Sequence, residues 1–132
     1  MLINGLDLNV IDEGASDVPL VLVHGYTGGA SDWDDVAPTL ASSRRVVRYD
    51  HRGHAQSTNT SDASSYTFDA LVRDLAALVD ALGVSQIDLL GHSMGGVTVM
   101  RYVLERPERV RSLVLMDTGA ELSGSLPQDL ID

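Results

Sequence analysis

The sequence predicts an α/β fold: a doubly wound, mostly parallel sheet of about six strands with flanking helices. Short apolar runs without alternation, at residues 19–23 and 87–90, are typical of strands covered on both faces. Other segments carry the apolar period of an amphipathic helix, most clearly residues 68–82. These strand and helix patterns alternate along the chain, which is the arrangement of a parallel sheet with helices on its faces.

The predicted strands begin with a short antiparallel pair. Residues 2–6 and 8–11 alternate apolar with polar side chains, and we interpret them as two strands that meet near Asp7. Residues 19–23 and 45–49 are expected to be the first two buried strands of the sheet.

Helix boundaries are marked by capping residues. Ser31 is expected to be the N-cap of the first helix, and Pro38 should kink or restart that helix. Thr67 is expected to cap the helix over residues 68–82, which Gly83 ends.

The C-terminal part continues the alternation. A strand that leads up to Gly91 is followed by a helix over residues 97–106 and by a last strand over residues 110–116. Residues 58–65 are expected to be a polar loop, and residues 119–132 a loop with one short turn.

Composition limits the classes of partner. The chain of 132 residues has a net charge of −10 and contains no lysine, so it should repel nucleic acid and anionic membranes. The lack of cysteine excludes disulfides, thiolate catalysis and cysteine-based zinc sites. The first five residues do not match a signal peptide, and no apolar run is long enough to span a bilayer. We therefore expect a cytoplasmic protein.

The segment Gly91-His92-Ser93-Met94-Gly95 matches the pattern G-x-S-x-G between a predicted strand and a predicted helix. Such a tight turn places its central serine in a strained conformation, and flanking glycines let the strand and the helix approach closely. The hydroxyl then lies at the positive end of a helix, which favours a developing negative charge. The alternative is a chance match in a glycine-rich loop.

Loops that leave the carboxyl ends of parallel strands gather at one edge of the sheet, where ligands bind. Four such loops are expected to begin at His24, Asp50, Ser93 and Asp117. A serine nucleophile needs a base and hydrogen-bond donors for the oxyanion. The N–H of Met94 should point into the site, and the loop that contains Gly25 brings a second N–H, that of Tyr26, close to it.

The histidines are expected to be structural. His24 should fix its loop by hydrogen bonds to the main chain, and His92 should point away from the serine. His51 and His54 should shape the loop that Asp50 anchors. The pair lacks a third ligand at suitable spacing, so no metal site is expected.

Asp117 allows two interpretations. It follows the last predicted strand, at the correct edge of the sheet. It would therefore either orient a catalytic histidine or serve as an ordinary turn aspartate.

The chain resembles the α/β-hydrolase family over nearly its whole length. Three motifs carry this resemblance, at residues 24–29, 50–57 and 91–96, and the segment 113–117 that follows them is also similar to the family. The resemblance implies that Ser93 is the nucleophile of a cofactor-free hydrolase that acts on small ester-like molecules. Esterases, lactonases and carbon–carbon bond hydrolases share this serine, whereas haloalkane dehalogenases and epoxide hydrolases carry aspartate there. Asp117 matches an acid position that a minority of the family uses.

The catalytic histidine of the family follows the serine along the chain, and no histidine follows Ser93. The resemblance therefore implies that residues 1–132 are the N-terminal part of a single hydrolase domain, in which residues 117–132 begin the cap. It also implies that the isolated chain is inactive. The strand at Val110–Met116 would be an exposed edge that a C-terminal half or a second copy should cover. Alternatives are a carbon–carbon hydrolase, an enol-lactonase or a cofactor-free perhydrolase, or a non-catalytic half-domain that associates through this edge.

Overall fold

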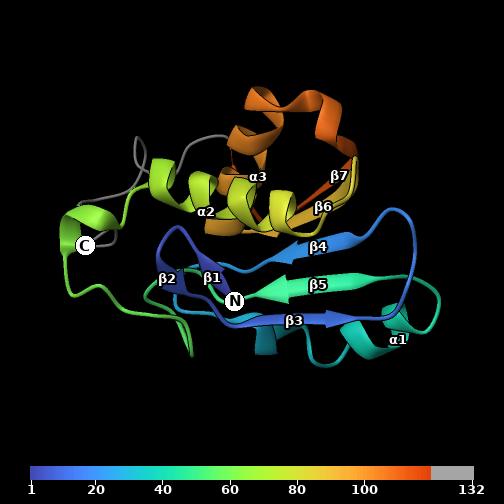
Figure 1. Cartoon of the computed structure of the whole chain (residues 1–132), viewed down its shortest axis with the longest axis horizontal. Coiled ribbons are helices and arrows are strands. Elements are labelled where there is room, and N and C mark those ends of the chain that lie inside the picture. Colours follow the sequence, from blue (N-terminus) through green and yellow to red (C-terminus); the bar gives the residue numbers. More distant parts are fainter. Residues whose placement is uncertain (120–132) are drawn as a thin grey trace.

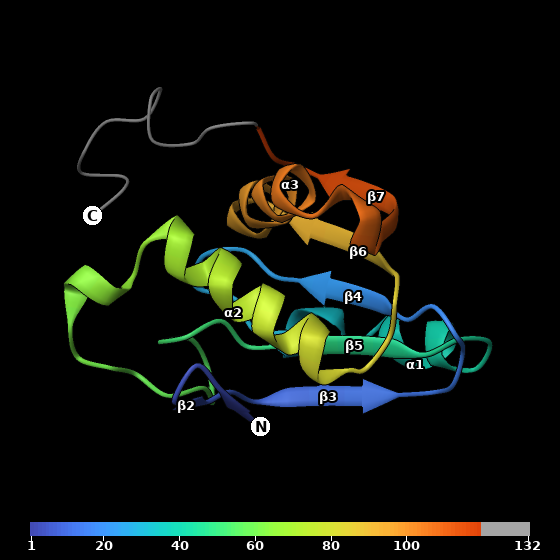
Figure 2. The same ribbon diagram turned by 45° about the horizontal axis from the view of Figure 1, so that its top comes forward.

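A computed structural model describes residues 1–119 as a five-stranded sheet with helices on both faces (Figures 1 and 2). The spatial order of the strands is β3 (Val10–Glu13), β5 (Val46–Tyr49), β4 (Leu20–Val23), β6 (Ile87–His92) and β7 (Val110–Met116). All neighbours are parallel except β3 and β5. The predicted α/β class is confirmed, with five strands in the sheet and two more in a separate hairpin.

The N-terminal pairing differs from the prediction. The separate hairpin joins β1 (Leu2–Ile3) to β2 (Leu6–Asp7), and the chain reverses at Asn4 and Gly5 rather than near Asp7. Both turn residues have positive φ, 49° and 81°, which a two-residue hairpin turn of this kind requires. The strand that follows does not return to this hairpin. Instead, β3 pairs antiparallel with β5 and forms one edge of the sheet.

The face behind β4 and β5 is covered by a short 3₁₀ helix, η1 (Ala30–Trp33), and by α1 (Ala37–Ala41). Ser31 lies inside η1, so its prediction as the N-cap was wrong. The N-cap is Gly29, whose N–H donates to the Asp32 carboxylate at 3.3 Å. The chain restarts as a second helix near Pro38, as predicted, because proline fits the first helical turn, where no N–H is needed.

The opposite face carries the two long helices, α2 (Phe68–Ala81) and α3 (Met94–Glu105) (Figure 2). Thr67 caps α2 as predicted, accepting the N–H of Ala70 at 3.1 Å, and Gly83 follows the end of the helix with φ of 70°. Helix α3 begins directly after Ser93, three residues earlier than predicted.

Two further 3₁₀ turns complete the described elements, η2 (Ala63–Ser65) within the predicted polar loop and η3 (Pro107–Arg109) before β7. The expectation for residues 119–132 falls outside the described residues, apart from Gly119.

The main core lies between the sheet and the two long helices. Leu75, Leu78 and Val79 of α2 are fully buried there, together with Val99 and Tyr102 of α3. A smaller cluster on the other face packs Trp33 and Ala37 against Leu20 and Leu22 of β4 and Val46 of β5. Because both faces are covered, the central strands are mostly apolar: β4 is apolar throughout, while β5 contains Arg48 and β6 contains Asp88, both buried.

Strand β7 forms the second edge of the sheet. Within the described residues it pairs with β6 alone, and its apolar side chains Val114, Leu115 and Met116 are 40–50% exposed. The strand is therefore a long apolar edge of the kind that soluble proteins normally cover.

Candidate active site

Ser93 occupies the turn between β6 and α3 with φ of 55° and ψ of −117°. A non-glycine residue in this region costs about 1–3 kcal/mol and persists only where its surroundings fix it. The predicted strand–turn–helix context of the G-x-S-x-G segment is therefore present. The serine lies at the N-terminus of α3, where the helix dipole favours negative charge.

The two flanking glycines allow this turn by their lack of a side chain. A Cβ on Gly91 would lie 2.6 Å from the carbonyl oxygen of Gly95, and a Cβ on Gly95 would overlap the carbonyl oxygens of Val23 and His24. The start of α3 is thus pressed against the ends of both β6 and β4. Larger residues at these positions would separate the serine from the loop that follows β4.

The loop after β4 lies directly beside the serine. A Cβ built on Gly25 would be 3.1 Å from the Cβ of Ser93, so the loop after β4 contacts the turn that holds the serine. Tyr26 is the next residue of this loop. Met94 is the first residue of α3, where an N–H has no acceptor within the helix. Among residues 1–119 the N–H groups of Tyr26 and Met94 donate no hydrogen bond. Two main-chain donors are therefore available near the hydroxyl.

His24 and His51 form a buried pair that fixes the loop after β4. Nε2 of His24 accepts the main-chain N–H of His51 at 2.9 Å, so its proton is on Nδ1, which donates to the carbonyl of Gly25 at 2.6 Å. Nε2 of His51 donates in turn to the carbonyl of His24 at 3.0 Å. Burial lowers the pKa of His24 and sets the pKa of His51 well below its ordinary value. Both rings are neutral at pH 7 and engaged with the main chain.

Asp50 links its own loop to the loop after β4. Its Oδ1 accepts the N–H of Ala30 at 2.6 Å, and its Oδ2 accepts from the side chain of Asn9 and the N–H of Gln56, both at 3.0 Å. The sequence indicated an anchor for one loop, and the carboxylate in fact joins three segments. The contact with Ala30 was missed because it crosses 20 residues without a local pattern.

The remaining candidates lie at the same edge of the sheet. His92 is half-buried, with Nδ1 3.3 Å from the position of a Cβ on Gly25, so its ring packs against the loop after β4. His54 is partly buried and its ring centroid lies 5.2 Å from that of His24. Asp117 is exposed, with φ of 47°, at the end of β7 beside the strand that leads to Ser93.

Sequence reasoning missed one neighbour of the serine. The hydroxyl of Thr118 donates a hydrogen bond of 2.7 Å to the main-chain carbonyl of Ser93. Thr118 belongs to none of the three motifs, and no periodicity or spacing connects it with the elbow.

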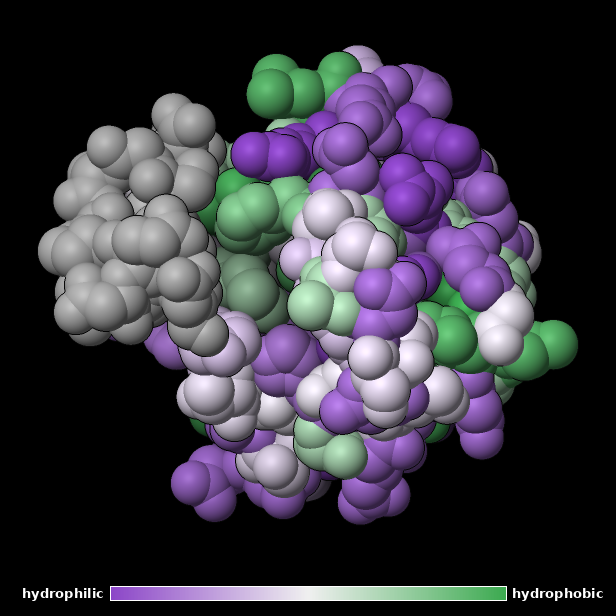
Figure 3. Space-filling view, turned by 90° about the vertical axis from the view of Figure 1, so that its left-hand side faces the viewer, coloured by the Kyte–Doolittle hydropathy of each residue, from purple (hydrophilic) through white to green (hydrophobic). Residues whose placement is uncertain are grey.

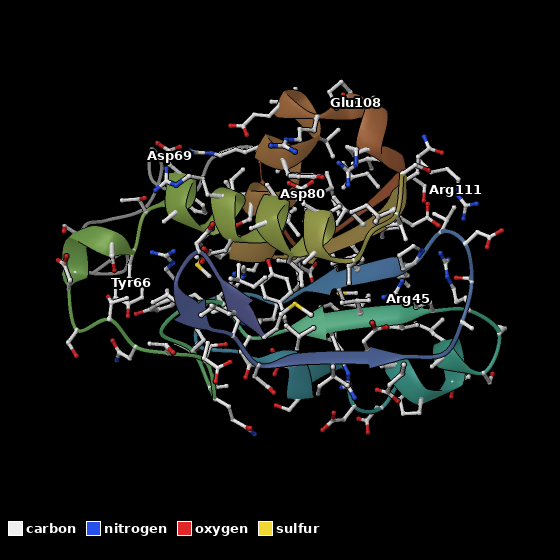
Figure 4. The ribbon with its side chains drawn as sticks, in the orientation of Figure 1. Arg45, Tyr66, Asp69, Asp80, Glu108 and Arg111 are labelled. Atoms are coloured by element: carbon white, nitrogen blue, oxygen red, sulfur yellow. The ribbon has the colours of Figure 1, made fainter. Side chains whose placement is uncertain are left out.

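Figure 3 views the molecule from the end toward which β4 and β5 point, where weakly polar and apolar residues occupy the middle and hydrophilic residues lie above and below. The charged cluster around Asp88 lies at the opposite end of the parallel strands. Arg111, at that end in Figure 4, joins Arg44 and Ser112 in holding the Asp88 carboxylate and keeping its pKa below the usual range. This cluster is remote from the serine.

No group of three or more potential ligands within residues 1–119 is arranged to hold a metal ion. Across the same residues, no helix has the length and apolar character that a membrane span requires.

Comparison with known proteins gives a consistent result. The family described as alpha/beta hydrolase fold matches residues 18–131. A 2-hydroxymuconate semialdehyde hydrolase from Pseudomonas sp. strain CF600 is 40% identical over 118 residues, 87% of this chain and 41% of that protein. The sn-1-specific diacylglycerol lipase ABHD11 of Mus musculus is 36% identical over 85% of this chain and 36% of its own length.

Solved structures agree with these relatives. An epoxide hydrolase from Vigna radiata superimposes with a TM-score of 0.88 at 28% identity, over 99% of this chain and 43% of that one. A marine microorganism esterase gives a TM-score of 0.83 at 25% identity, over 96% of this chain and 47% of the esterase. The chain spans about two-fifths of the length of the curated relatives it matches. With its elbow, its parallel sheet and these matches, the chain belongs to the α/β-hydrolase fold family.

Proposed function

We propose that this chain carries the nucleophile and the oxyanion hole of a serine hydrolase that acts on carboxylic esters. The observation that carries the proposal is the conformation of Ser93, strained at φ of 55° and placed at the N-terminus of α3. The N–H groups of Tyr26 and Met94 are the proposed donors to the oxyanion. Serine rather than aspartate at the elbow favours an acyl-enzyme mechanism over direct attack by a carboxylate.

In the proposed reaction, Oγ of Ser93 attacks the ester carbonyl carbon while a base takes its proton. The carbonyl oxygen becomes an oxyanion held by the two N–H groups. Collapse of this intermediate breaks the bond to the alkoxy group, which leaves as an alcohol with that proton. Water then attacks the acyl-enzyme, releasing the acid and restoring the serine hydroxyl.

The base is proposed to be a histidine outside these 132 residues. His24 and His51 hold their protons in hydrogen bonds to main-chain carbonyls, and burial lowers the pKa of each, so neither is suited to accept a proton from Ser93. Asp117 is proposed to accept the Nδ1–H of the incoming histidine, because it ends the strand beside β6 at the same edge. This chain alone should then retain only binding and the oxyanion hole.

The exposed edge of β7 is the proposed contact for a further part of the hydrolase domain. We propose that residues 1–132 form the N-terminal part of one hydrolase domain and that a C-terminal half, or failing that a second copy, pairs with Val110–Met116. The length of the curated relatives supports the first occupant. Covering the edge would also remove Val114, Leu115 and Met116 from water.

The proposal is tested by supplying the missing base as free imidazole. The chain is incubated with a fluorophosphonate, and the adduct is located by mass spectrometry. We expect an adduct on Ser93 that increases with imidazole and is absent from Ser93→Ala. Ser85→Ala is the matched control, since Ser85 is an exposed serine just before the other end of β6 and should not affect labelling. No adduct at any imidazole concentration, or equal labelling of exposed serines, would contradict the proposal.

A second reaction is favoured by the names of two relatives. Besides the semialdehyde hydrolase, a 2-hydroxy-6-oxo-2,4-heptadienoate hydrolase from Pseudomonas putida is 37% identical over 88% of this chain. The same serine site would then cleave a carbon–carbon bond beside a ketone. Enol-lactonase and perhydrolase activities would use the same residues. The non-catalytic alternative predicts no labelling of Ser93 under any of these conditions.

A further inference from the structure

We propose that Thr118 is a positioning residue that aims the N–H of Met94 at the oxyanion. It would act by holding the main-chain carbonyl of Ser93. This inference rests on the proposed function for its catalytic meaning, but its geometric content concerns one peptide group and is tested separately. None of the sequence motifs contains Thr118.

The main chain of Ser93 is fixed from the neighbouring strand at both ends. Its N–H donates to the carbonyl of Met116 at 3.1 Å, and its carbonyl accepts the hydroxyl of Thr118 at 2.7 Å. The N–H groups of Gly96 and Val97 also reach this carbonyl, at 2.9 and 3.3 Å. The helix therefore supplies two of these bonds, and the end of β7 supplies the other two.

The side chain of Thr118 packs directly against the main chain of Gly96. A Cβ on Gly96 would overlap Oγ1 of Thr118 and would lie 2.5 Å from its Cβ and Cγ2. Gly96 therefore leaves the space in which Thr118 sits over the start of α3. This contact gives a physical reason for the second glycine after Met94.

The consequence follows from the planarity of the peptide bond. The carbonyl of Ser93 and the N–H of Met94 belong to one trans peptide group, so they point in opposite directions. A hydrogen bond that fixes the carbonyl also fixes the direction of the N–H. It polarises the amide as well, which strengthens the N–H as a donor. The φ of Ser93 is strained, so its surroundings must hold this peptide group, and Thr118 adds one bond from outside the helix to the two that α3 supplies.

The test compares three variants of the full chain. Thr118→Val keeps the shape of the side chain but removes its hydroxyl. Thr118→Ala removes the hydroxyl and places no new atom in the space beside Gly96. Thr118→Ser keeps the hydroxyl. Two quantities are measured: the rate of imidazole-assisted fluorophosphonate labelling of Ser93, and the NMR shifts of the Ser93 carbonyl carbon and the Met94 amide. Thr118→Val and Thr118→Ala each test the loss of the hydroxyl against the unchanged chain. If one of them does not fold, the other still gives the result.

We expect Thr118→Val and Thr118→Ala to slow the labelling of Ser93 about tenfold, which is the effect of losing one hydrogen bond of this type. Both should shift the Ser93 carbonyl and Met94 amide resonances, while Ser should restore the rate and the shifts. Unchanged shifts in Val and Ala would overturn the inference, as would changed shifts with an unchanged rate. If the wild-type chain is not labelled at all, the proposed function fails, and the shifts alone decide whether Thr118 holds this peptide group.

Discussion

The main-chain N–H of His51 donates to Nε2 of His24 at 2.9 Å, and the His51 ring returns a bond of 3.0 Å to the carbonyl of His24. This reciprocal contact joins the loops that follow β4 and β5. It also commits each ring to one neutral tautomer, because protonating Nε2 of His24 would remove the acceptor for His51. The loop that contains Tyr26 is therefore held by two groups that must stay uncharged.

Stability should fall as the pH is lowered through the histidine range. Burial lowers the pKa of both rings. The hydrogen bond to Gly25 opposes this effect at His24, and the neighbouring His24 and His54 reinforce it at His51. Below pH 6.5 the unfolded state therefore binds more protons than the folded state. The free energy of unfolding should decrease with a slope that approaches about 1.4 kcal/mol per pH unit for each ring.

Urea unfolding between pH 7 and pH 5 measures this slope, and His51→Gln should reduce it. A flat profile over this interval would show that the buried rings do not titrate as the structure requires.

The elbow glycine Gly95 should not tolerate alanine. A Cβ there would overlap the carbonyl of Val23 and lie 2.5 Å from that of His24. We expect Gly95→Ala to destabilise the chain by about 2 kcal/mol or more, although alanine would normally favour a helix by about 1 kcal/mol.

Gly5→Ala is the comparison for this variant. Gly5 has φ of 81° but no atom within 4 Å of the added group, so its cost should be only the backbone strain of about 1 kcal/mol. Equal urea midpoints for the two variants would argue against the close packing at the elbow.

The buried ion pair of Arg52 and Asp74 should contribute strongly to stability. The Asp74 carboxylate accepts Nε and Nη2 of Arg52 at 2.7 and 2.8 Å and the Asn4 amide at 3.0 Å, and its side chain is 1% exposed. Asp74→Asn leaves a guanidinium inside without its partner, which costs about 3 kcal/mol in comparable cases.

The surface pair of Arg45 and Asp12 serves as the matched control. Its carboxylate is 36% exposed and accepts two guanidinium bonds, yet Asp12→Asn should cost less than about 1 kcal/mol. Thermal or urea unfolding of the two variants should separate them clearly, and similar losses would contradict the assignment of the buried pair.

The β7 edge should promote self-association of the isolated chain. Val114 and Leu115 are half-exposed on a strand that pairs on one side within the described residues. Light scattering should show association that rises with protein concentration, and Leu115→Lys should suppress it because a charge on an edge strand opposes pairing. Leu104→Lys is the control, since Leu104 is 83% exposed but lies on α3. A chain that stays monomeric, or equal effects of both variants, would count against this edge as the contact.

The sequence alone placed the serine between a strand and a helix, because G-x-S-x-G and the apolar runs around it are local patterns. The Thr67 cap was equally local, since the side chain binds an N–H three residues later. Each of these features depends on neighbours within one turn or on burial of a continuous run.

Only the tertiary structure decided how these pieces meet. The bond from Ala30 to Asp50, the pairing of β3 with β5, and the bond from Thr118 to Ser93 depend on residues brought together from distant parts of the chain. Periodicity carries no record of such contacts, because it reports which side of an element is buried and not what lies against it. The turn that places Ser93 between a strand and a helix was therefore predictable from its pentapeptide, whereas the groups that hold Ser93 in place became visible only once the strands were set side by side.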